Sequence, residues 1–296
     1  MKNGSTSGSI IAIAGTGALG RSLARAFVAA GMPLKVMLSR DPASVLLPDE
    51  LATVRVITSG PAIFHPEAGL LLFLAVPDGA IGTTAERLSQ SGRWEGTTVV
   101  HCSGAMPASL LEPLKSKGAS VASFHPVQTF APGSGPESFR DIIISLQGDE
   151  MAVKRLEPVV TKLGARALRV DEAGKLKLHL AAVFISNYLA GLMEAAGEIA
   201  GDLAGSGITI EDVLGPIHVS AARNIVRSDR RQALTGPILR GDCETVRRHL
   251  DALNGNTELI QLYARLGLYT LRVAKAVRTE PGHKAIRNLL ESIIGK

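Results

Sequence analysis

Several features that would assign a sequence to a special class are scarce in this chain of 296 residues. It has only two cysteines, Cys102 and Cys243, which excludes a disulfide-bonded scaffold and favours a reducing cytoplasm. Basic and acidic residues number 16 and 13 up to residue 170 and 16 and 14 beyond it, so no basic region indicates nucleic acid. The longest uncharged apolar stretch of the second half, 178–193, has 16 residues, and we expect no membrane partner. Aromatic residues make up only 4%, so we expect an aliphatic core.

The pattern of apolar residues along the sequence changes at about residue 170. Up to Val170, short apolar runs alternate with helix-like segments, which is typical of a mostly parallel, doubly wound sheet between helices. Beyond it we find only helical patterns, over 172–204, 209–228, 243–253, 256–278 and 283–294. We therefore predict an α/β domain at 10–170 and an all-α domain at 171–296. We expect residues 1–9 to be a disordered N-terminus without a signal peptide.

A glycine-rich turn follows the first apolar run. Gly15-Thr16-Gly17-Ala18-Leu19-Gly20 has the spacing G-x-G-x-x-G, between a strand and an amphipathic helix. In such a turn Gly15 permits the tight bend, Gly17 lets the backbone approach a pyrophosphate, and Gly20 lets helix and strand pack closely. This context predicts a dinucleotide-binding Rossmann domain whose cofactor contacts are the residues of the turn.

The end of the second predicted strand bears on the choice of cofactor. Proteins that prefer NAD usually carry an acidic residue there, which binds the ribose 2′-hydroxyl. This chain has Ser39-Arg40, and Arg40 is suited to pair with a 2′-phosphate. Asp41 is the alternative, as a displaced acid that would favour NAD. On the charge of Arg40 we favour NADP(H).

Three further polar segments end apolar runs and should lie at the same edge of the sheet. They are Val76-Pro77-Asp78, His101-Cys102-Ser103-Gly104 and Ser123-Phe124-His125-Pro126. Ligands bind at the carboxyl ends of strands in open α/β sheets. We therefore assign Val76 and Pro77 to the cofactor, and Ser103, Gly104 and His125 to the substrate.

The first helix of the second half carries a polar cluster on an apolar background. At about 100° per residue, Lys175, His179 and Ser186 fall within roughly 40° of one another, and Asn187 flanks them. Burying such groups is costly unless they are paired or used. A lysine ammonium or an imidazolium can stabilise the charge that develops on a carbonyl oxygen and supply its proton. We predict Lys175, His179 and Asn187 as catalytic residues and Ser186 as a substrate ligand.

Other polar residues are open to more than one interpretation. Arg240 could bind a substrate carboxylate in a bidentate fork, or brace a loop or a dimer contact. His101, His125 and His179 match no metal-ligand spacing, and we predict no metal. Cys102 has no base beside it in the sequence and is expected to be a buried thiol rather than a nucleophile.

The chain resembles Rossmann-like proteins whose helical C-terminal domain is of the domain of unknown function 2520 type. The matching segments are GTGALG at 15–20, LAVPD at 74–78, HCSG at 101–104, SFHPVQTF at 123–130, HLAAVFISNYL at 179–189 and ALTGPILRGDCETVRRHL at 233–250. Leu178 is a departure, because the family often has a tyrosine before the histidine.

In plan this family is similar to ketopantoate reductases, 6-phosphogluconate dehydrogenase-like β-hydroxyacid dehydrogenases and pyrroline-5-carboxylate reductases. Those proteins reduce small carbonyl or imine substrates with NADP(H) in a cleft between two domains. The resemblance implies a helical domain of the 6-phosphogluconate dehydrogenase type and a homodimer built through it. Several relatives have a lysine with an asparagine four residues later. Lys175 matches the lysine, whereas the asparagine position holds His179.

These observations together predict a cytoplasmic NADP-dependent oxidoreductase. Its substrate would be a small oxo or hydroxy acid, similar to ketopantoate or a β-hydroxyacid, and its chemistry hydride transfer. Two alternatives remain: a non-catalytic protein that binds and senses NADP(H), and an enzyme that exchanges hydride between NADP and a deazaflavin. A sensor would have no need for Lys175 and His179 beside the cofactor.

Overall fold

The computed structural model describes residues 10–58, 66–201, 207–228, 231–253 and 255–295. The expected disorder of residues 1–9 falls outside this described part. The chain divides into two compact units, Met1–Tyr188 and Leu189–Lys296. The sequence boundary at 170/171 marks the end of the last strand, but the first unit also holds the helix that follows, because a buried lysine of that helix bonds to the α/β domain.

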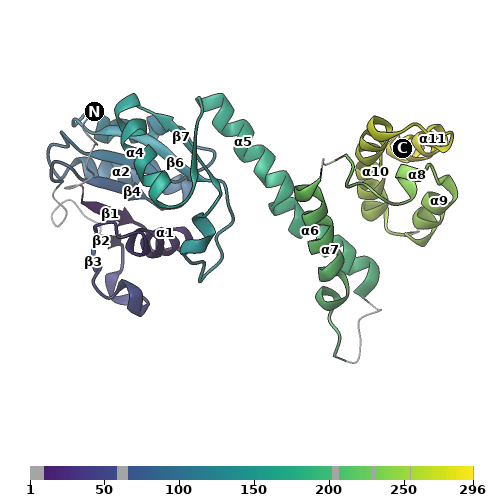
Figure 1. The fold of residues 1–296 in the computed structure, drawn as a ribbon, viewed down its shortest axis with the longest axis horizontal. Helices are drawn as coiled ribbons and strands as arrows, with labels where there is room; N and C mark the ends of the chain where they lie inside the picture. The colour runs from purple at the N-terminus through teal and green to yellow at the C-terminus, as the bar shows by residue number, and fades with distance from the viewer. Residues whose placement is uncertain (1–9, 59–65, 202–206, 229–230, 254, 296) are drawn as a thin grey trace. The chain divides into compact units, whose positions relative to one another are not determined.

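An eight-stranded sheet forms the centre of the first unit (Figure 1). Its strands follow the predicted apolar runs: β1 (Ile11–Ala14), β2 (Leu34–Ser39), β3 (Arg55–Thr58), β4 (Leu71–Leu74), β5 (Thr98–His101), β6 (Ser120–Pro126), β7 (Ile143–Gly148) and β8 (Arg166–Arg169). The strand order is β3-β2-β1-β4-β5-β6-β7-β8. Every neighbouring pair is parallel except β6 and β7. The mostly parallel, doubly wound sheet is therefore confirmed.

Helices cover both faces of this sheet. The helices of the first unit are α1 (Ala18–Ala29), α2 (Ile81–Ser89), α3 (Glu112–Lys115), α4 (Glu150–Lys162) and α5 (Glu172–Ile185). Ile11 and Ile13 of β1 join a core cluster with α1 and α4, whereas Ala12 and Ala14 join a cluster with α2 and α3. Alternate residues of one strand thus serve the two faces, which explains why the strands are apolar throughout.

The buried core of the described residues is mainly aliphatic, as expected, and contains five aromatic side chains. Other aromatic residues, such as Phe184, Tyr188 and Tyr269, are exposed. Phe27, Phe73 and Phe124 form a chain of ring contacts, with centroids 4.9 Å and 5.1 Å apart, and Trp94 and Phe139 are also fully buried. Large rings contribute much buried apolar area per residue, so a small number suffices.

The strand order reverses between β1 and β4, and this position locates a binding site. The chain adds β2 and β3 on one side of β1 and then returns to place β4 on the other. Ala14 pairs with Leu38 and with Leu74, and Leu74 pairs with His101. The carboxyl ends of these strands are therefore level, and the loops that follow them meet at the edge where open α/β sheets bind ligands.

The helix predicted over 172–204 is interrupted at Ser186. The residue has φ −125° and ψ −72°, and it ends α5; α6 (Asn187–Ala200) begins directly after it. Taken together, Glu172–Ala200 is long and apolar enough by length and composition to cross a membrane, and none of its most apolar window is buried. This stretch is longer than the 178–193 segment considered in the sequence, although each of the two helices has only 14 residues, fewer than the roughly 20 that a span needs.

The second unit is helical in its described residues. Besides most of α6 it contains α7 (Ile210–Arg227), α8 (Pro237–Arg240), α9 (Cys243–Ala252), α10 (Thr257–Val277) and α11 (Gly282–Ile294). A small core joins α9, α10 and α11 through Val246, Leu250, Ala264, Leu271, Ile286 and Leu290. In contrast, α6 and α7 bury no residue. The all-α prediction for this region is confirmed, and two of its helices contribute no residue to the core.

Candidate active site

The three glycines of the turn have the roles that their spacing predicts. Gly15 has φ +115°, and a methyl group built on it would overlap the Ala75 carbonyl. A methyl group on Gly20 would overlap the Gly15 carbonyl and approach Ala75. A methyl group on Gly17 would meet no atom within 4 Å. Gly15 and Gly20 are therefore required by the packing of the turn, whereas Gly17 leaves room for a ligand.

A cavity of about 680 Å³ lies beside this turn. Seven of the ten residues predicted to bind the cofactor line it: Gly15, Thr16, Gly17, Ser39, Arg40, Val76 and Pro77. Ala18 lines an adjoining cavity of about 620 Å³, and Leu19 and Gly20 continue the turn into α1. The volume is within the range of small-molecule and cofactor sites. The segments that the sequence assigned to the cofactor thus come together at one cavity.

Ser39, Arg40 and Asp41 form one wall of this cavity at the end of β2. The Ser39 hydroxyl donates to the Asp41 carbonyl at 3.1 Å, and the Asp41 amide donates to the Ser39 hydroxyl at 3.3 Å. This local turn fixes the backbone on both sides of Arg40. A cation and a carboxylate therefore lie side by side at the position that distinguishes a ribose 2′-phosphate from a hydroxyl.

The N-cap residue of α2, Ala80, and three residues on the helix, Thr83, Thr84 and Arg87, line the same cavity and were missed in the sequence. They follow the segment Val76-Pro77-Asp78 at intervals of three or four residues. That periodicity was available as a signal, because such residues share one helix face.

The loop after β5 is braced by His101, which is fully buried. The Ser103 amide donates to His101 Nδ1 at 3.2 Å, so the ring proton is on Nε2 and is donated to the Pro107 carbonyl at 3.1 Å. Burial, and then the charge of Lys175, lower the pKa of His101 to about 4. His101 is therefore a neutral side chain that fixes the loop.

Ser103 uses its polar atoms within the protein. Its hydroxyl accepts from the amides of Ala105 and Met106 at 3.2 Å and 3.0 Å, and its amide is bonded to His101. Its carbonyl accepts a 2.5 Å hydrogen bond from Lys175 Nζ. Ser103 was predicted as a substrate ligand; in this geometry it positions the loop and Lys175.

Lys175 is the one residue of α5 that is buried, with 1% of its surface exposed. It lies in the first turn of the helix, which Asp171 caps by accepting from the Gly174 amide at 2.7 Å. Burial lowers the pKa of Lys175 to about 8, while Cys102 and Asp78 act in the opposite direction to a smaller extent. Among the described residues Lys175 forms no ion pair with a carboxylate. A buried ammonium whose carboxylate partner is missing is costly in a folded protein and is expected where a ligand uses it.

His125 and His179 lie next to this lysine. Their ring centroids are 5.7 Å apart in an edge-to-face arrangement, and His125 Nδ1 is 3.5 Å from the Ser145 hydroxyl. Burial, and then the charge of Lys175, lower the pKa of His125 to about 4. A methyl group built on Gly104 would overlap both rings, so this glycine allows the two histidines to approach the loop. The structure thus brings together Lys175, Ser103, Gly104, His125 and His179.

Asp78 connects the two parts of the site. It directly follows Pro77 at the edge of the cavity, and its charge acts on both Lys175 and His101. Electrostatic interactions of this kind require proximity. The lysine cluster is therefore adjacent to the Val76-Pro77 side of the cofactor cavity, within the first unit.

Two of the predicted site residues bond to each other away from this cluster. The Ser186 hydroxyl lies 2.7 Å from the Ala182 carbonyl and 2.9 Å from Asn187 Oδ1, and these two acceptors share its single proton at the α5–α6 junction. The sequence analysis treated them as part of one continuous helix, which ends at Ile185 instead. Arg240 is exposed at the end of α8 in the second unit. Its binding role stays a prediction.

Two further expectations concern metals and thiols. In the described part of the chain, no group of three His, Cys, Asp or Glu residues could hold a metal ion. Cys102 is buried, and burial raises the pKa of its thiol to about 12, which makes it a poor nucleophile.

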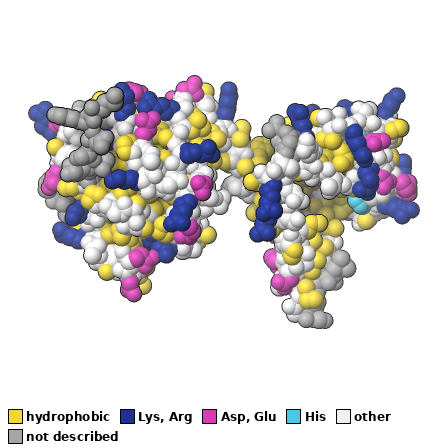
Figure 2. All heavy atoms as spheres, viewed as in Figure 1, with side chains coloured by type: hydrophobic (Ala, Val, Ile, Leu, Met, Phe, Trp, Pro, Cys, Tyr) yellow, Lys and Arg dark blue, Asp and Glu magenta, His cyan; other side chains and the backbone are white. Residues whose placement is uncertain are grey.

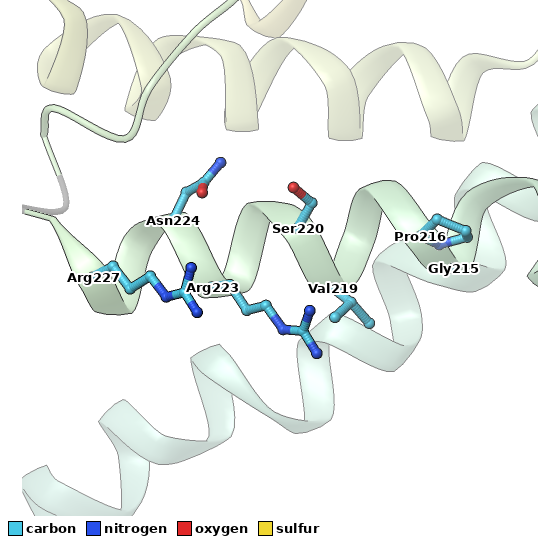
Figure 3. A pocket seen from close by; sticks show the side chains of 7 residues that line it. All are labelled: Gly215, Pro216, Val219, Ser220, Arg223, Asn224 and Arg227. Atoms are coloured by element: carbon cyan, nitrogen blue, oxygen red, sulfur yellow. The ribbon is translucent and has the colours of Figure 1, made fainter.

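A separate hollow of about 470 Å³ lies along one helix of the second unit (Figure 3). It is lined only by residues of α7, namely Gly215, Pro216, Val219, Ser220, Arg223, Asn224 and Arg227. None of the residues predicted for substrate or cofactor belongs to it. All of these lining residues come from successive turns of α7, and we call this hollow the groove along α7.

Replacing Gly104 with alanine is expected to displace the His125 and His179 rings. We expect a stability loss of about 1–3 kcal/mol, typical of overpacking, and a kcat/KM about 10- to 100-fold lower in any reaction that uses the two rings. Thermal unfolding and steady-state kinetics test this. Gly82→Ala is the matched control, because a methyl group there meets no atom within 4 Å. Full activity in Gly104→Ala would mean that the two rings do not serve the reaction.

Two family models together span most of the chain. Residues 3–126 match the model described as a Rossmann-like domain, and residues 142–270 match the model described as a domain of unknown function, DUF2520. None of the curated proteins with which the sequence was compared matches it.

Solved structures with the same fold cover nearly the whole chain. A candidate NADP oxidoreductase from Bacteroides fragilis is 24% identical, with a TM-score of 0.74, over 90% of this chain and 100% of that one. Protein TM1727 from Thermotoga maritima is 26% identical, with a TM-score of 0.70, over 91% and 100%. A reductive aminase from Aspergillus terreus in complex with NADPH and ethyl levulinate is 16% identical, with a TM-score of 0.55, over 97% and 93%. The chain therefore contains one region that matches a Rossmann-like domain and a second that matches a DUF2520 domain, and it shares the fold of the Bacteroides fragilis and Thermotoga maritima proteins.

Proposed function

We propose that this protein is an NADP-dependent oxidoreductase that acts by hydride transfer on a small oxo or hydroxy acid. The observation that carries the proposal is Lys175, a buried ammonium without a carboxylate partner in the described chain, next to a cavity shaped for a dinucleotide. A protein that only senses NADP(H) would gain nothing from this costly group. The oxidoreductase names of similar folds support the same reaction class.

The cavity fits NADP(H) in both shape and charge. The open side of Gly17 and the N-terminus of α1 suit a pyrophosphate, because the first amides of a helix lack partners within it. Arg40 suits the 2′-phosphate, and Val76 and Pro77 border the side of the cavity that leads to Lys175. When bound, the nicotinamide would supply or accept the hydride.

Lys175 would act on the oxygen of the substrate. Its Nζ is held by the Ser103 carbonyl through one hydrogen bond, which leaves two donors for a ligand. A protonated Lys175 would stabilise negative charge on a carbonyl oxygen and then give that oxygen a proton. Its lowered pKa of about 8 suits proton transfer near neutral pH. His179 and His125 would orient the substrate beside it.

Thermal unfolding with and without cofactor tests this proposal. A ligand at 100 times its Kd stabilises the folded state by about 2.7 kcal/mol, a shift of several degrees in Tm for a chain of this size. We expect a larger shift with NADPH than with NADH. A panel of small oxo acids, ketopantoate included, would then be screened for NADPH oxidation. No shift with either nucleotide would refute the proposal, and a larger shift with NADH would assign the ribose contact to Asp41.

We also propose that the protein is a homodimer formed through its exposed helices. Over α5 to α7, exposed large apolar side chains recur on every helix, and apolar side chains are visible at the surface of α6 and α7 in Figure 2. They are Leu176, Leu180, Phe184, Ile185, Tyr188, Leu192, Ile199, Ile208, Val213, Ile217, Val219, Ile225 and Val226. With about half of each side chain exposed, they present on the order of 1,000 Å² of apolar surface, more than a monomer usually exposes and close to one side of a standard interface.

A further inference from the structure

A second arginine lines the cofactor cavity, besides the one at the end of β2. Arg87 lies in the last turn of α2 and borders the same cavity as Arg40. We propose that Arg87 acts together with Arg40 on the 2′-phosphate of NADP(H) and so sets the preference for NADP over NAD. The inference rests on the proposed function, since it requires that the cavity holds this cofactor.

One side of α2 packs on the sheet, and another side lines the cavity. Ile81, Ala85 and Leu88 are fully buried and pack on the sheet. Ala80, Thr83, Thr84 and Arg87 line the cavity, at intervals that place them on one face of the helix. Arg87 therefore belongs to the wall of the cavity.

The position of Arg87 along α2 fits the far end of a dinucleotide. Gly15 packs against Ala75, just before α2, so the glycine turn lies near the start of this helix. From Ala80 to Arg87 the helix axis advances by about 10 Å. Ser39, Arg40 and Asp41 line the same cavity from the end of β2, so both arginines border the space beside the glycine turn.

The charges of the cavity lining support a second cation. Besides the two arginines, its lining contains one carboxylate, Asp41. A phosphate monoester carries a charge of about −1.5 to −2 at pH 7. Two guanidinium groups and one carboxylate give this lining a net charge of +1, which suits an anionic phosphate. Guanidinium groups also offer paired donors that match phosphate oxygens.

Arg87 also has a simpler possible role that the test must separate. A cation in the last turn of a helix interacts favourably with the helix dipole. In that role Arg87 would affect stability and would leave the affinities for NADPH and NADH equally unchanged. The ratio of the two affinities is therefore the informative quantity.

Calorimetric titration of the full-length protein with NADPH, NADH, 2′,5′-ADP and 5′-ADP tests the inference. We expect Arg87→Gln to raise Kd for NADPH and 2′,5′-ADP about 10- to 30-fold and to change Kd for NADH and 5′-ADP less than about twofold. Arg87→Lys should restore part of the affinity. Arg93→Gln, which removes the same charge from an exposed arginine outside the cavity lining, should change neither.

Three outcomes would overturn the inference. An equal loss for NADPH and NADH would assign Arg87 to the part of the nucleotide that the two share. A lower Tm with unchanged affinities would assign it to the end of α2. A response of NADPH binding to Arg40→Gln but not to Arg87→Gln would leave the proposed function standing and refute the role of Arg87. If the wild-type protein binds no dinucleotide, the proposed function fails and this inference fails with it.

Discussion

Replacing Lys175 with methionine is expected to lower kcat for the oxo acid that wild type reduces best by on the order of 10³-fold. Methionine keeps the length and the apolar stem but removes both the charge and the proton. Kd for NADPH should change less than about threefold, because Lys175 does not line the cofactor cavity. Stopped-flow reduction and titration with NADPH measure the two quantities separately.

The wild-type pH profile should report the same group. The pKa of Lys175 is lowered to about 8, so the ammonium form is lost as pH rises through that value. Reduction needs the protonated lysine, and kcat/KM should fall above pH 8. The reverse oxidation needs the neutral amine and should rise over the same range. The two opposite limbs share one pKa, which a merely structural lysine would not produce.

Lys177→Met is the matched control for this substitution. Lys177 lies two residues away on α5 and is exposed. Its replacement should leave turnover and the pH profile unchanged. Unchanged turnover in Lys175→Met would refute the catalytic role and favour a protein that binds the cofactor without chemistry.

Stability provides an independent readout of the buried ammonium. Below pH 8 Lys175 is protonated in both the folded and the unfolded chain, and its burial destabilises the fold in full. Between about pH 8 and the ordinary pKa of 10.5 the unfolded chain binds the extra proton, so this destabilisation is relieved as pH rises. Urea unfolding should therefore show that Lys175→Met has a larger free energy of unfolding than wild type at pH 7.5. The difference should disappear at pH 9.5.

The cofactor half of the site could be predicted because its causes are local in the sequence. The roles of Gly15, Gly17 and Gly20 follow from backbone sterics, and the parallel register brings the ends of β1, β2 and β4 level. Spacing and strand order were therefore enough to place Arg40 and Val76 at one cavity. Arg87 was missed because arginines near helix ends are common, although its spacing from Pro77 and Ala80 was available as a signal.

The substrate half was less predictable, since it depends on tertiary contacts. Lys175 and His179 were selected from one helix face, and their place beside Gly104 confirms that they meet the loop after β5. The break at Ser186 is invisible in an apolar sequence without proline, so Ser186 and Asn187 were placed on a helix that had ended. The use of Ser103 by His101 and Lys175 also needed coordinates, because hydrogen bonds between distant segments leave no local pattern.

A glutamate at Ile217 together with one at Val219 is expected to convert the proposed homodimer to a monomer. The two residues are exposed on α7, two positions apart and therefore on nearly opposite sides of the helix. Val219 lines the groove along α7, and Ile217 is 68% exposed. Burying an unpaired carboxylate in an apolar interface costs several kcal/mol, which corresponds to at least a 10³-fold weaker dimer. Light scattering after size exclusion measures the mass directly.

The same variant tests whether a second copy of the chain or another surface, such as a membrane, covers α6 and α7. Wild type should have twice the mass of the chain, and Arg93→Glu, with the same change of two charge units at a polar exposed position, should keep it. Because α6 and α7 bury no residue within their own chain, loss of the dimer should also lower Tm and expose these helices to protease. If wild type is monomeric and sediments with lipid vesicles, Glu172–Ala200 would instead be assigned to a membrane surface. If wild type is monomeric and does not bind vesicles, neither the dimer nor the membrane surface is supported. In the dimer, the apolar helices that contribute nothing to the core of one chain would supply the core of the pair.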